Sequence, residues 1–524
     1  MRNASNAVPN SFSWRVWACA VALSVCAAYG GEAAVSPAEA TFQKGVEAVK
    51  AKQFEEAAKQ FLEAAKAGHG TAQHNLGILQ LTGSGVPRDV KSALGWFQKA
   101  AEQGQGDAKV QLAELYFQGL GVEKDAPTGL KLLSEAADSG YAPAMLRLGN
   151  LYRLGLDENG QGVVPRDLEA YAAWHRKAAS AGLSDAQYSM GLIYSEGQGV
   201  RQDFAQAARW FGQAAEAGHA RAQVRYAGAL AQGLGIPKDE VGARAWVQKA
   251  ADQGLADGQF KLGVMFRDGL GGKAEPEKAA EWFGKAAAQN DGEAQHALAL
   301  LHLNGTGVAK DAKLAAELCR KAAEGGLAAA QVTYALLLIN GHGVGIDQAA
   351  AAVWTKRAAE QGHPQAQHNL GLMYLNGTGV AQDHAKAAAC FRAAAARGNT
   401  ESSVQYAVLL FKGQGVEKDE AEAFGLMQRA AEQGSLLAMT NTGIMFRDGT
   451  GTAKDSKAAV GWFKQAAEKG WADAQFALGL AYEQGDGLAS DLASAKAWYE
   501  KASAQGHARA QAALKRLSEG VLGK

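Results

Sequence analysis

The sequence predicts an all-α protein, an α/α solenoid of short helix pairs, and three observations support this fold class. A nine-residue stretch occurs in three versions spaced 36 residues apart, beginning at Leu303, Ile339 and Leu375. Every version has glycine at its third and fifth positions and ends in aspartate, which is typical of one helix ending and another beginning. Between these stretches, apolar residues recur with the spacing of an amphipathic helix. A constant period of this length indicates a stacked repeat.

Twelve units of this period occupy residues 72–509. All steps between units are 36 residues, except for one step of 42 that contains the third unit. The units begin at Ala72, Ala108, Ala144, Ala186, Ala222, Gly258, Ala294, Ala330, Ala366, Ser402, Ala438 and Ala474. The six additional residues of the third unit lie between Gly155 and Asp167, in a loop that is either part of a binding face or a tolerated insertion.

The first helix of each unit carries the pattern A-Q-x-x-L-G-x-x-Y, as in Ala366 to Tyr374. Its Leu and Tyr are four residues apart and therefore share one face. The residue after the Leu is Gly or Ala in all twelve units, which predicts a close contact with another helix. A glycine then ends this helix in every unit.

The second helix follows an aspartate in eleven units and Glu275 in the other, so an N-cap is predicted at this position. The helix carries the pattern A-x-x-W-F-x-K-A-A, with Trp in eight units at a position that we expect to be buried. It ends at a glycine in eleven units, and Asn290 replaces that glycine in the remaining one. Because Asn tolerates the left-handed backbone well, this exception also fits a helix C-cap.

The glycine-rich loops could instead be phosphate-binding loops, but their context argues against this. A phosphate-binding loop follows a strand and occurs once, whereas these loops follow a helix and occur in every unit. We therefore expect no nucleotide site and no cofactor.

The complete pattern, A-x-x-x-L-G-x-x-Y-x-x-G-x-G-V-x-x-D-x-x-K-A-x-x-W-F-x-K-A-A-x-x-G, resembles the Sel1-like repeat family, which is related to tetratricopeptide repeats. The resemblance implies a right-handed superhelix with the first helices on its inner wall. Residues 34–71 resemble a tetratricopeptide-like helix pair without the glycine loop, and we expect them to cap the N-terminal end. Residues 510–524 are expected to form a C-terminal capping helix.

Residues 1–33 are expected to be a secretory signal peptide. Arg2 and Arg15 precede an apolar run of 15 residues from Val16 to Gly30, which is shorter than the roughly 20 residues of a membrane-spanning helix. We therefore expect a periplasmic or secreted protein without a membrane span. The alternative is a lipid anchor to the outer membrane on Cys26, because the residues from Leu23 to Cys26 resemble a lipoprotein box.

Charge and motifs narrow the function further. The 53 basic and 53 acidic residues balance, whereas a nucleic-acid partner would require a basic surface. The chain has no H-E-x-x-H, C-x-x-C or G-x-S-x-G motif, so we expect no metal site and no catalytic residues. Outside the signal, Cys319 and Cys390 lie on second helices two units apart, too far for a disulfide. Cys390 stands at the Trp position, where we expect it to be a small buried side chain.

A ladder of asparagines marks the candidate binding site. Asn304, Asn340 and Asn376 occupy one position at the end of the first helix in three adjacent units. By analogy with tetratricopeptide repeats this position faces the concave groove, where each amide could both donate and accept a hydrogen bond with a peptide. The alternative is that Asn before Gly only ends the helix. The candidate partner-binding residues are Arg267, Asp268, His296, Leu303, Asn304, Ile339, Asn340, His368, Leu375 and Asn376.

Two neighbouring groups belong to the same interpretation. Leu300, Leu336 and Leu372 are expected to lie beside the asparagines in the groove. Arg267 and Asp268 recur five units later as Arg447 and Asp448, and the alternative for both pairs is a local ion pair on the surface.

The preferred function is therefore that of an exported scaffold, not an enzyme, which binds a protein or peptide in the bacterial envelope or outside the cell. The resemblance implies roles in envelope assembly, signalling or host-protein binding. One alternative, implied by a cysteine-rich branch of the same family, is β-lactam binding or hydrolysis, although the cysteine pairs of that branch are missing here. The other alternative is a purely structural spacer. The sequence does not specify the partner or the oligomeric state.

Overall fold

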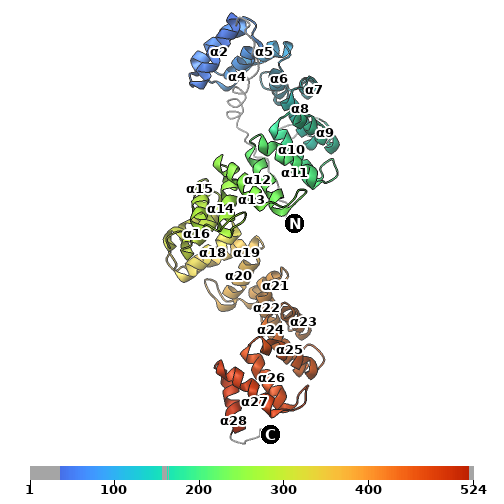
Figure 1. The fold of residues 1–524 in the computed structure, drawn as a ribbon, viewed down its shortest axis with the longest axis vertical. Helices are drawn as coiled ribbons and strands as arrows, with labels where there is room; N and C mark the ends of the chain where they lie inside the picture. Colours follow the sequence, from blue (N-terminus) through green and yellow to red (C-terminus); the bar gives the residue numbers. More distant parts are fainter. Residues whose placement is uncertain (1–35, 156–161, 163, 519–524) are drawn as a thin grey trace. The chain divides into compact units, whose positions relative to one another are not determined.

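The computed structural model describes residues 36–155, 162 and 164–518. The predicted signal peptide, Cys26 and most of the third unit's insertion lie outside the described residues. Within the described part the chain forms 27 α-helices and no strands, which confirms the predicted all-α repeat solenoid. The chain divides into two compact parts, each made of several repeats. The first unit, in this second sense, is residues 1–258 with 270–272, and the second unit is residues 259–269 with 273–524 (Figure 1).

The helices of the first unit pack against their neighbours in chain order. They are α2 (Pro37–Lys50), α3 (Phe54–Lys66), α4 (Gly70–Thr82), α5 (Val90–Glu102), α6 (Gly106–Gln118), α7 (Ala126–Asp138), α8 (Ala142–Leu154), α9 (Leu168–Ser180), α10 (Ser184–Glu196), α11 (Phe204–Glu216), α12 (Ala220–Gln232) and α13 (Glu240–Asp252). From α4 onward, even numbers are the first helices of the repeats and odd numbers are the second helices.

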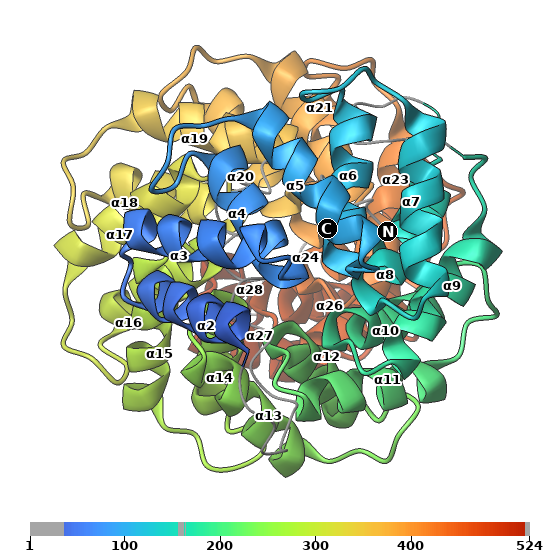
Figure 2. The same cartoon turned by 90° about the horizontal axis from the view of Figure 1, so that it is seen from above.

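The boundary between the two units falls inside α14, and the helices of the second unit continue the same alternation. They are α14 (Ala256–Asp268), α15 (Pro276–Ala288), α16 (Gly292–Asn304), α17 (Ala312–Glu324), α18 (Ala328–Asn340), α19 (Gln348–Glu360), α20 (Pro364–Asn376), α21 (His384–Ala395), α22 (Thr400–Lys412), α23 (Glu420–Glu432), α24 (Leu436–Asp448), α25 (Ser456–Glu468), α26 (Ala472–Gln484), α27 (Leu492–Ala504) and α28 (Ala508–Ser518). Figure 2 shows α16 to α20 following one another side by side.

The loop within each repeat is built by its two glycines, for two different reasons. Gly341 ends α18 with φ of 69°, a left-handed conformation that costs glycine little and other residues more. Gly343 lies against the preceding second helix, where an added Cβ would come within 1.9 Å of the Ala312 carbonyl oxygen. The second glycine is therefore required by packing between repeats, and the loop is a fixed joint.

The predicted caps are confirmed. All eleven loop-ending aspartates accept a hydrogen bond from a backbone N–H in the first turn of the following helix; in α19, Asp347 accepts from Ala350 at 2.8 Å. Glu275 occupies the N-cap position of α15 but makes no side-chain capping bond to a backbone N–H; its carboxylate instead pairs with the Lys278 ammonium in the first turn at 2.5 Å. Asn290 has φ of 64°, so it adopts the left-handed conformation of the glycines that it replaces.

The residue buried at the centre of each helix pair is not the Trp that the sequence pattern led us to expect. Every Trp of the second helices is only half-buried, and the following residue is the one that is fully buried. Six of the eight Trp rings instead carry a cation from the next turn, as where the Lys285 ammonium lies 3.7 Å from the Trp282 ring centroid. Cys390, at a Trp position, is likewise only half-buried, whereas Cys319 occupies the buried position and has no exposure.

The small residue of the first helix and the buried residue of the second helix form a matched pair. An added Cβ on Gly371 would lie 2.6 Å from the Phe391 ring, so a ring at this position requires glycine opposite. Seven repeats pair Gly with a ring: Gly77 with Phe97, Gly149 with His175, Gly191 with Phe211, Gly263 with Phe283, Gly371 with Phe391, Gly443 with Phe463 and Gly479 with Tyr499. Five repeats pair Ala with a side chain that has no ring: Ala113 with Leu133, Ala227 with Val247, Ala299 with Cys319, Ala335 with Thr355 and Ala407 with Met427.

The Gln of the first helix joins successive repeats. In α18, Gln331 Nε2 donates to the Ala323 carbonyl of the preceding second helix at 3.1 Å, and its Oε1 accepts from Gln361 Nε2 at 3.0 Å. The same two bonds are made by Gln73, Gln223 and Gln475. Each of these carbonyls also accepts a backbone bond, as where the Gly326 N–H donates to the Ala323 carbonyl at 3.0 Å, so the buried amide adds a second bond that ties one repeat to the next.

His175 gives the fold a testable pH dependence. Its ring is 1% exposed, and burial lowers its pKa to about 4. Because the unfolded chain binds a proton near the ordinary pKa of about 6.5, the stabilisation is complete above that pH and is lost as the pH falls toward 4. His175→Phe keeps a ring opposite Gly149 and removes the titration. Urea unfolding between pH 7 and pH 4.5 should show the wild type losing about 2–3 kcal/mol more than this variant; parallel losses would contradict the assignment.

Candidate partner-binding face

The candidate site lies on the exposed side of the first helices of the second unit. On α18 the side chains of Leu336 and Asn340 are one turn apart on the same face, and Leu336 is 43% exposed. The positions equivalent to Leu336 are aliphatic in all seven repeats of this unit: Val264, Leu300, Leu336, Leu372, Val408, Ile444 and Leu480. In the first unit they are mixed: Ile78, Glu114, Asn150, Leu192 and Gly228.

The three asparagines are the last residues of α16, α18 and α20, and all three are exposed. The left-handed glycine that follows each of them makes the helix-ending hydrogen bond, as where the Gly305 N–H donates to the Leu301 carbonyl at 2.8 Å. Within the described part of the chain, no hydrogen bond of the three side-chain amides is found. Helix capping therefore uses the glycine backbone and leaves the amides open to solvent.

The asparagine–leucine face consists of Leu300, Leu336, Leu372, Asn304, Asn340 and Asn376. Leu303, Ile339 and Leu375 lie beside the asparagines and are half-buried, so only part of each side chain is accessible. Leu303 and Ile339 pack partly against the hydrophobic core below them. They support the face and also contribute to its surface.

Charge is almost absent from the helices that carry this face. α18 and α20 contain no Lys, Arg, Asp or Glu, and α16 contains only Glu293. Charged residues return at both edges, with Arg267 and Asp268 on α14 and Lys412 on α22. In a chain with 20% charged residues, the result is an uncharged surface three repeats long.

The two candidate histidines join successive first helices. His296 Nε2 lies 2.9 Å from Thr333 Oγ1 on the next first helix, and His368 Nδ1 lies 2.8 Å from Ser402 Oγ. Burial lowers the pKa of both rings, so both are neutral at pH 7. These bonds link α16 to α18 and α20 to α22 through single side-chain contacts.

The Arg267 and Asp268 side chains satisfy one another. The guanidinium donates two hydrogen bonds, from Nε and Nη2 at 2.7 and 2.8 Å, to the two carboxylate oxygens. These bonds lower the pKa of Asp268. Arg447 and Asp448 repeat the arrangement at 2.7 and 2.9 Å. Both pairs are surface ion pairs, which matches the alternative that the sequence offered for them.

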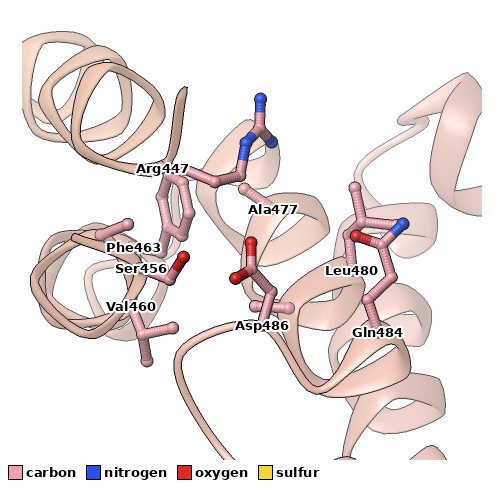
Figure 3. Close-up of a pocket in the computed structure, with 10 residues that line it drawn as sticks. Arg447, Ser456, Val460, Phe463, Ala477, Leu480, Gln484 and Asp486 are labelled. Carbon is pink, nitrogen blue, oxygen red and sulfur yellow. The ribbon is translucent and has the colours of Figure 1, made fainter. Parts of the chain in front are cut away.

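A pocket lies elsewhere in the second unit, between α25 and α26 (Figure 3). It encloses about 240 Å³, part of it open solvent, and its lining includes Arg447, Ser456, Leu480 and Asp486. Arg447 is already paired with Asp448. Ser456, Gln484 and Asp486 are the other polar side chains of the lining, and the pocket lies on helices outside the asparagine–leucine face.

Reactive groups are few in the described residues. Both cysteines are free thiols, and burial raises the pKa of Cys319 to about 12, which keeps it in the unreactive thiol form. No group of three or more His, Cys, Asp or Glu side chains suited to a metal ion occurs among residues 36–155 and 164–518. In the same ranges no helix is long and apolar enough to cross a bilayer.

Comparison with known proteins identifies the repeats. A family model described as Sel1 repeat matches twelve consecutive segments, each starting two residues before the unit boundary expected from the sequence. The segments are 70–105, 106–141, 142–183, 184–219, 220–255, 256–291, 292–327, 328–363, 364–399, 400–435, 436–471 and 472–507. No curated protein matches the chain.

Two solved structures share the fold. One is a protective antigen of uropathogenic Escherichia coli strains that displays an SLR fold; it is 32% identical, covers 82% of this chain and 91% of its own, and has a TM-score of 0.65. The other is a Sel1 repeat protein from Oxalobacter formigenes, 30% identical, with 60% of this chain and 90% of its own covered and a TM-score of 0.50.

Proposed function

The chain belongs to the Sel1 repeat family, and on that premise we propose that it captures a protein or peptide partner on the asparagine–leucine face. Its stacked helix pairs form a scaffold suited to protein–protein interaction. The single observation that carries the proposal is the row of three solvent-open amides beside two exposed leucines, Leu300 and Leu336, and the half-buried Leu372, on helices almost without charge. These amides make no hydrogen bond within the chain, so a partner could donate to them and accept from them. The accessible apolar surface beside them could bury apolar groups of the same partner.

We also propose that the chain is exported and acts in the bacterial envelope or outside the cell. Support comes from the apolar run between Val16 and Gly30 and from the antigen of Escherichia coli to which the chain is similar. The intact mass of the protein recovered from its source cells tests this proposal. A mass that lacks about the first 30 residues would agree with export. A chain that begins at a lipid-modified Cys26 would show a lipid-anchored protein instead. A complete N-terminus on protein from the cytoplasm would refute export.

The binding proposal is tested by a paired substitution. Leu336→Ala with Asn340→Ala removes one apolar and one amide group from exposed positions, so the fold should remain. We expect capture of the partner from extracts of the source cells to fall about tenfold or more, since an exposed apolar contact and a lost hydrogen bond together amount to about 1.5 kcal/mol or more.

The matched control lies on a second helix of the same unit. Val353→Ala with Lys356→Ala also removes two exposed side chains, from α19, and should leave capture unchanged. Equal capture by all three proteins would favour the spacer function, and equal loss in both variants would show that the binding surface is not the asparagine–leucine face. Circular dichroism of each variant checks that folding is intact.

A further inference from the structure

The three asparagines of the asparagine–leucine face each precede a glycine. Asn–Gly is the sequence in which asparagine loses its side-chain amide most readily, because glycine has no side chain to hinder attack by its backbone nitrogen. Within the described part of the chain this sequence occurs only at Asn304, Asn340 and Asn376, and a fourth copy at Asn159 lies outside the described residues. The face therefore contains three amides that can be lost by a reaction of the chain with itself.

The reaction needs no oxidant, reductant or enzyme. The glycine nitrogen attacks the carbonyl carbon of the asparagine side chain, and the new C–N bond closes a succinimide ring. The side-chain amide leaves as ammonia, which takes up the proton that the glycine nitrogen gives away. Water then opens the ring: attack at the side-chain carbonyl gives aspartate, and attack at the main-chain carbonyl gives isoaspartate, in which the backbone runs through the side chain.

The helix ends hold the glycine nitrogens back from this reaction. The Gly305 N–H donates to the Leu301 carbonyl at 2.8 Å, and the glycines after Asn340 and Asn376 donate equivalent bonds. Each asparagine is the last residue of its helix, and the helical ψ of about −42° turns the following nitrogen away from the side-chain carbonyl carbon. Ring closure therefore requires that the last turn of the helix opens first.

The side-chain amides, in contrast, are open. All three asparagines are exposed, and no hydrogen bond of their side chains is found within the described residues. Helix ends open locally far more often than the whole chain unfolds. The opening of the last turn should therefore control the rate at which each amide is lost.

A carboxylate at these positions would have no cation beside it in the sequence. Two other repeats carry aspartate at the same helix position, Asp268 and Asp448, and in both the preceding arginine forms two hydrogen bonds with that carboxylate. In the asparagine repeats the preceding residue is aliphatic: Leu303, Ile339 or Leu375. Each lost amide would therefore place an uncompensated negative charge on helices that are almost without charge.

We propose that Asn304, Asn340 and Asn376 are sites of spontaneous deamidation, gated by the opening of the helix ends on which they stand, and that the reaction converts an uncharged face into an anionic one. The reaction follows from the sequence and the helix ends alone. Its consequence for partner capture rests on the proposed function, so the two are tested separately.

Peptide mapping by mass spectrometry tests the reaction on the full chain, which is incubated at mildly alkaline pH in buffer and in concentrated urea. We expect aspartate and isoaspartate to accumulate at the three asparagines in both samples, at least about tenfold more slowly in the folded chain. Gln232 and Gln484 hold the same helix position before glycine and should stay unchanged, because a glutamine must close a larger ring. Equal rates in the two samples, or no conversion of the folded chain on prolonged incubation, would overturn the proposal.

A variant that loosens one repeat tests the gating. Gly371→Ala crowds the Phe391 ring in the α20–α21 pair, so we expect faster deamidation at Asn376 and no change at Asn304. Hydrogen exchange of the Gly377 N–H should rise by the same factor, because exchange and ring closure require the same opening. Factors that differ between the two measurements would contradict the gating.

Aspartate variants test the consequence for binding. Asn304→Asp, Asn340→Asp and Asn376→Asp together reproduce the fully converted face and should lower partner capture about tenfold or more, because a partner would cover unpaired charges. Gln232→Glu with Gln484→Glu adds charge at the same helix position in other repeats and should leave capture unchanged. If peptide mapping gives the expected rates while the aspartate variant captures the partner like the wild type, the modification sites stand and the proposed binding face is wrong.

Discussion

Replacing Phe391 with alanine is expected to destabilise its repeat by about 3–5 kcal/mol, the typical cost of removing a fully buried ring. The Phe391 side chain has no exposure and packs against Gly371 on the neighbouring helix, so its removal leaves a cavity at the centre of the α20–α21 pair. Urea unfolding followed by circular dichroism measures the loss. Because a repeat depends mainly on its neighbours, hydrogen exchange in α20 and α21 should show where it occurs.

The adjacent residue provides the control for this measurement. Cys390 precedes Phe391 and is only half-buried, so Cys390→Ala should cost about 1 kcal/mol or less. Comparable losses for the two variants would mean that the Trp position and the ring position contribute equally, contrary to the burial that the structure shows.

Adding a single methyl group to Gly371 is the second change with a large expected effect. The new Cβ would lie 2.6 Å from the Phe391 ring, and overpacking of this kind costs about 1–3 kcal/mol, offset in part by the better helix propensity of alanine. Combining Gly371→Ala with Phe391→Met reproduces the natural pair of Ala407 and Met427. We expect the double variant to be more stable than the sum of the single losses by about 1–2 kcal/mol.

A double-mutant cycle in urea measures this coupling. If the losses of the two single variants simply add up in the double variant, the contact between residues 371 and 391 does not explain the matched pairs. The same cycle with Gly371→Ala and Cys390→Ala should give no coupling, because the Cys390 side chain is not among the close neighbours of the Gly371 position.

The sequence could predict the solenoid because its signals are local and repeated. A loop-ending aspartate can cap only the helix that follows it, and a glycine in the left-handed conformation ends a helix wherever it stands. Asn290 is the clearest case, since it was expected to adopt the left-handed conformation of the glycines that it replaces, and its φ is 64°.

What the sequence could not predict depends on contacts between repeats. The repeat pattern led us to expect the Trp position, here Trp282, in the core, yet the structure buries Phe283 and leaves Trp282 half-buried beneath Lys285. The signal that would have shown this is present in the sequence: glycine faces a ring and alanine faces a smaller side chain in every repeat. It becomes visible only when residues 20 positions apart, or 26 in the third repeat with its insertion, are compared across the repeats.

The candidate site was predicted in part. The asparagine ladder and its neighbouring leucines were visible from the period, and the structure shows the three asparagines, Leu300 and Leu336 exposed and Leu372 half-buried. The roles of His296 and Arg267 required coordinates, because each side chain is already occupied by a bond within the protein. Sequence spacing places such residues on a face but does not show which of their bonding groups are still free.

Site-specific photo-crosslinking tests the central claim most directly, the claim being that the repeats form a scaffold whose first helices capture a partner. A photoreactive amino acid replaces Leu336 in one protein and Val353 in another, two exposed aliphatic positions on α18 and α19. In source cells the account predicts a discrete crosslinked partner from position 336 and none from position 353. A partner crosslinked only from position 353, or from neither position, would contradict it.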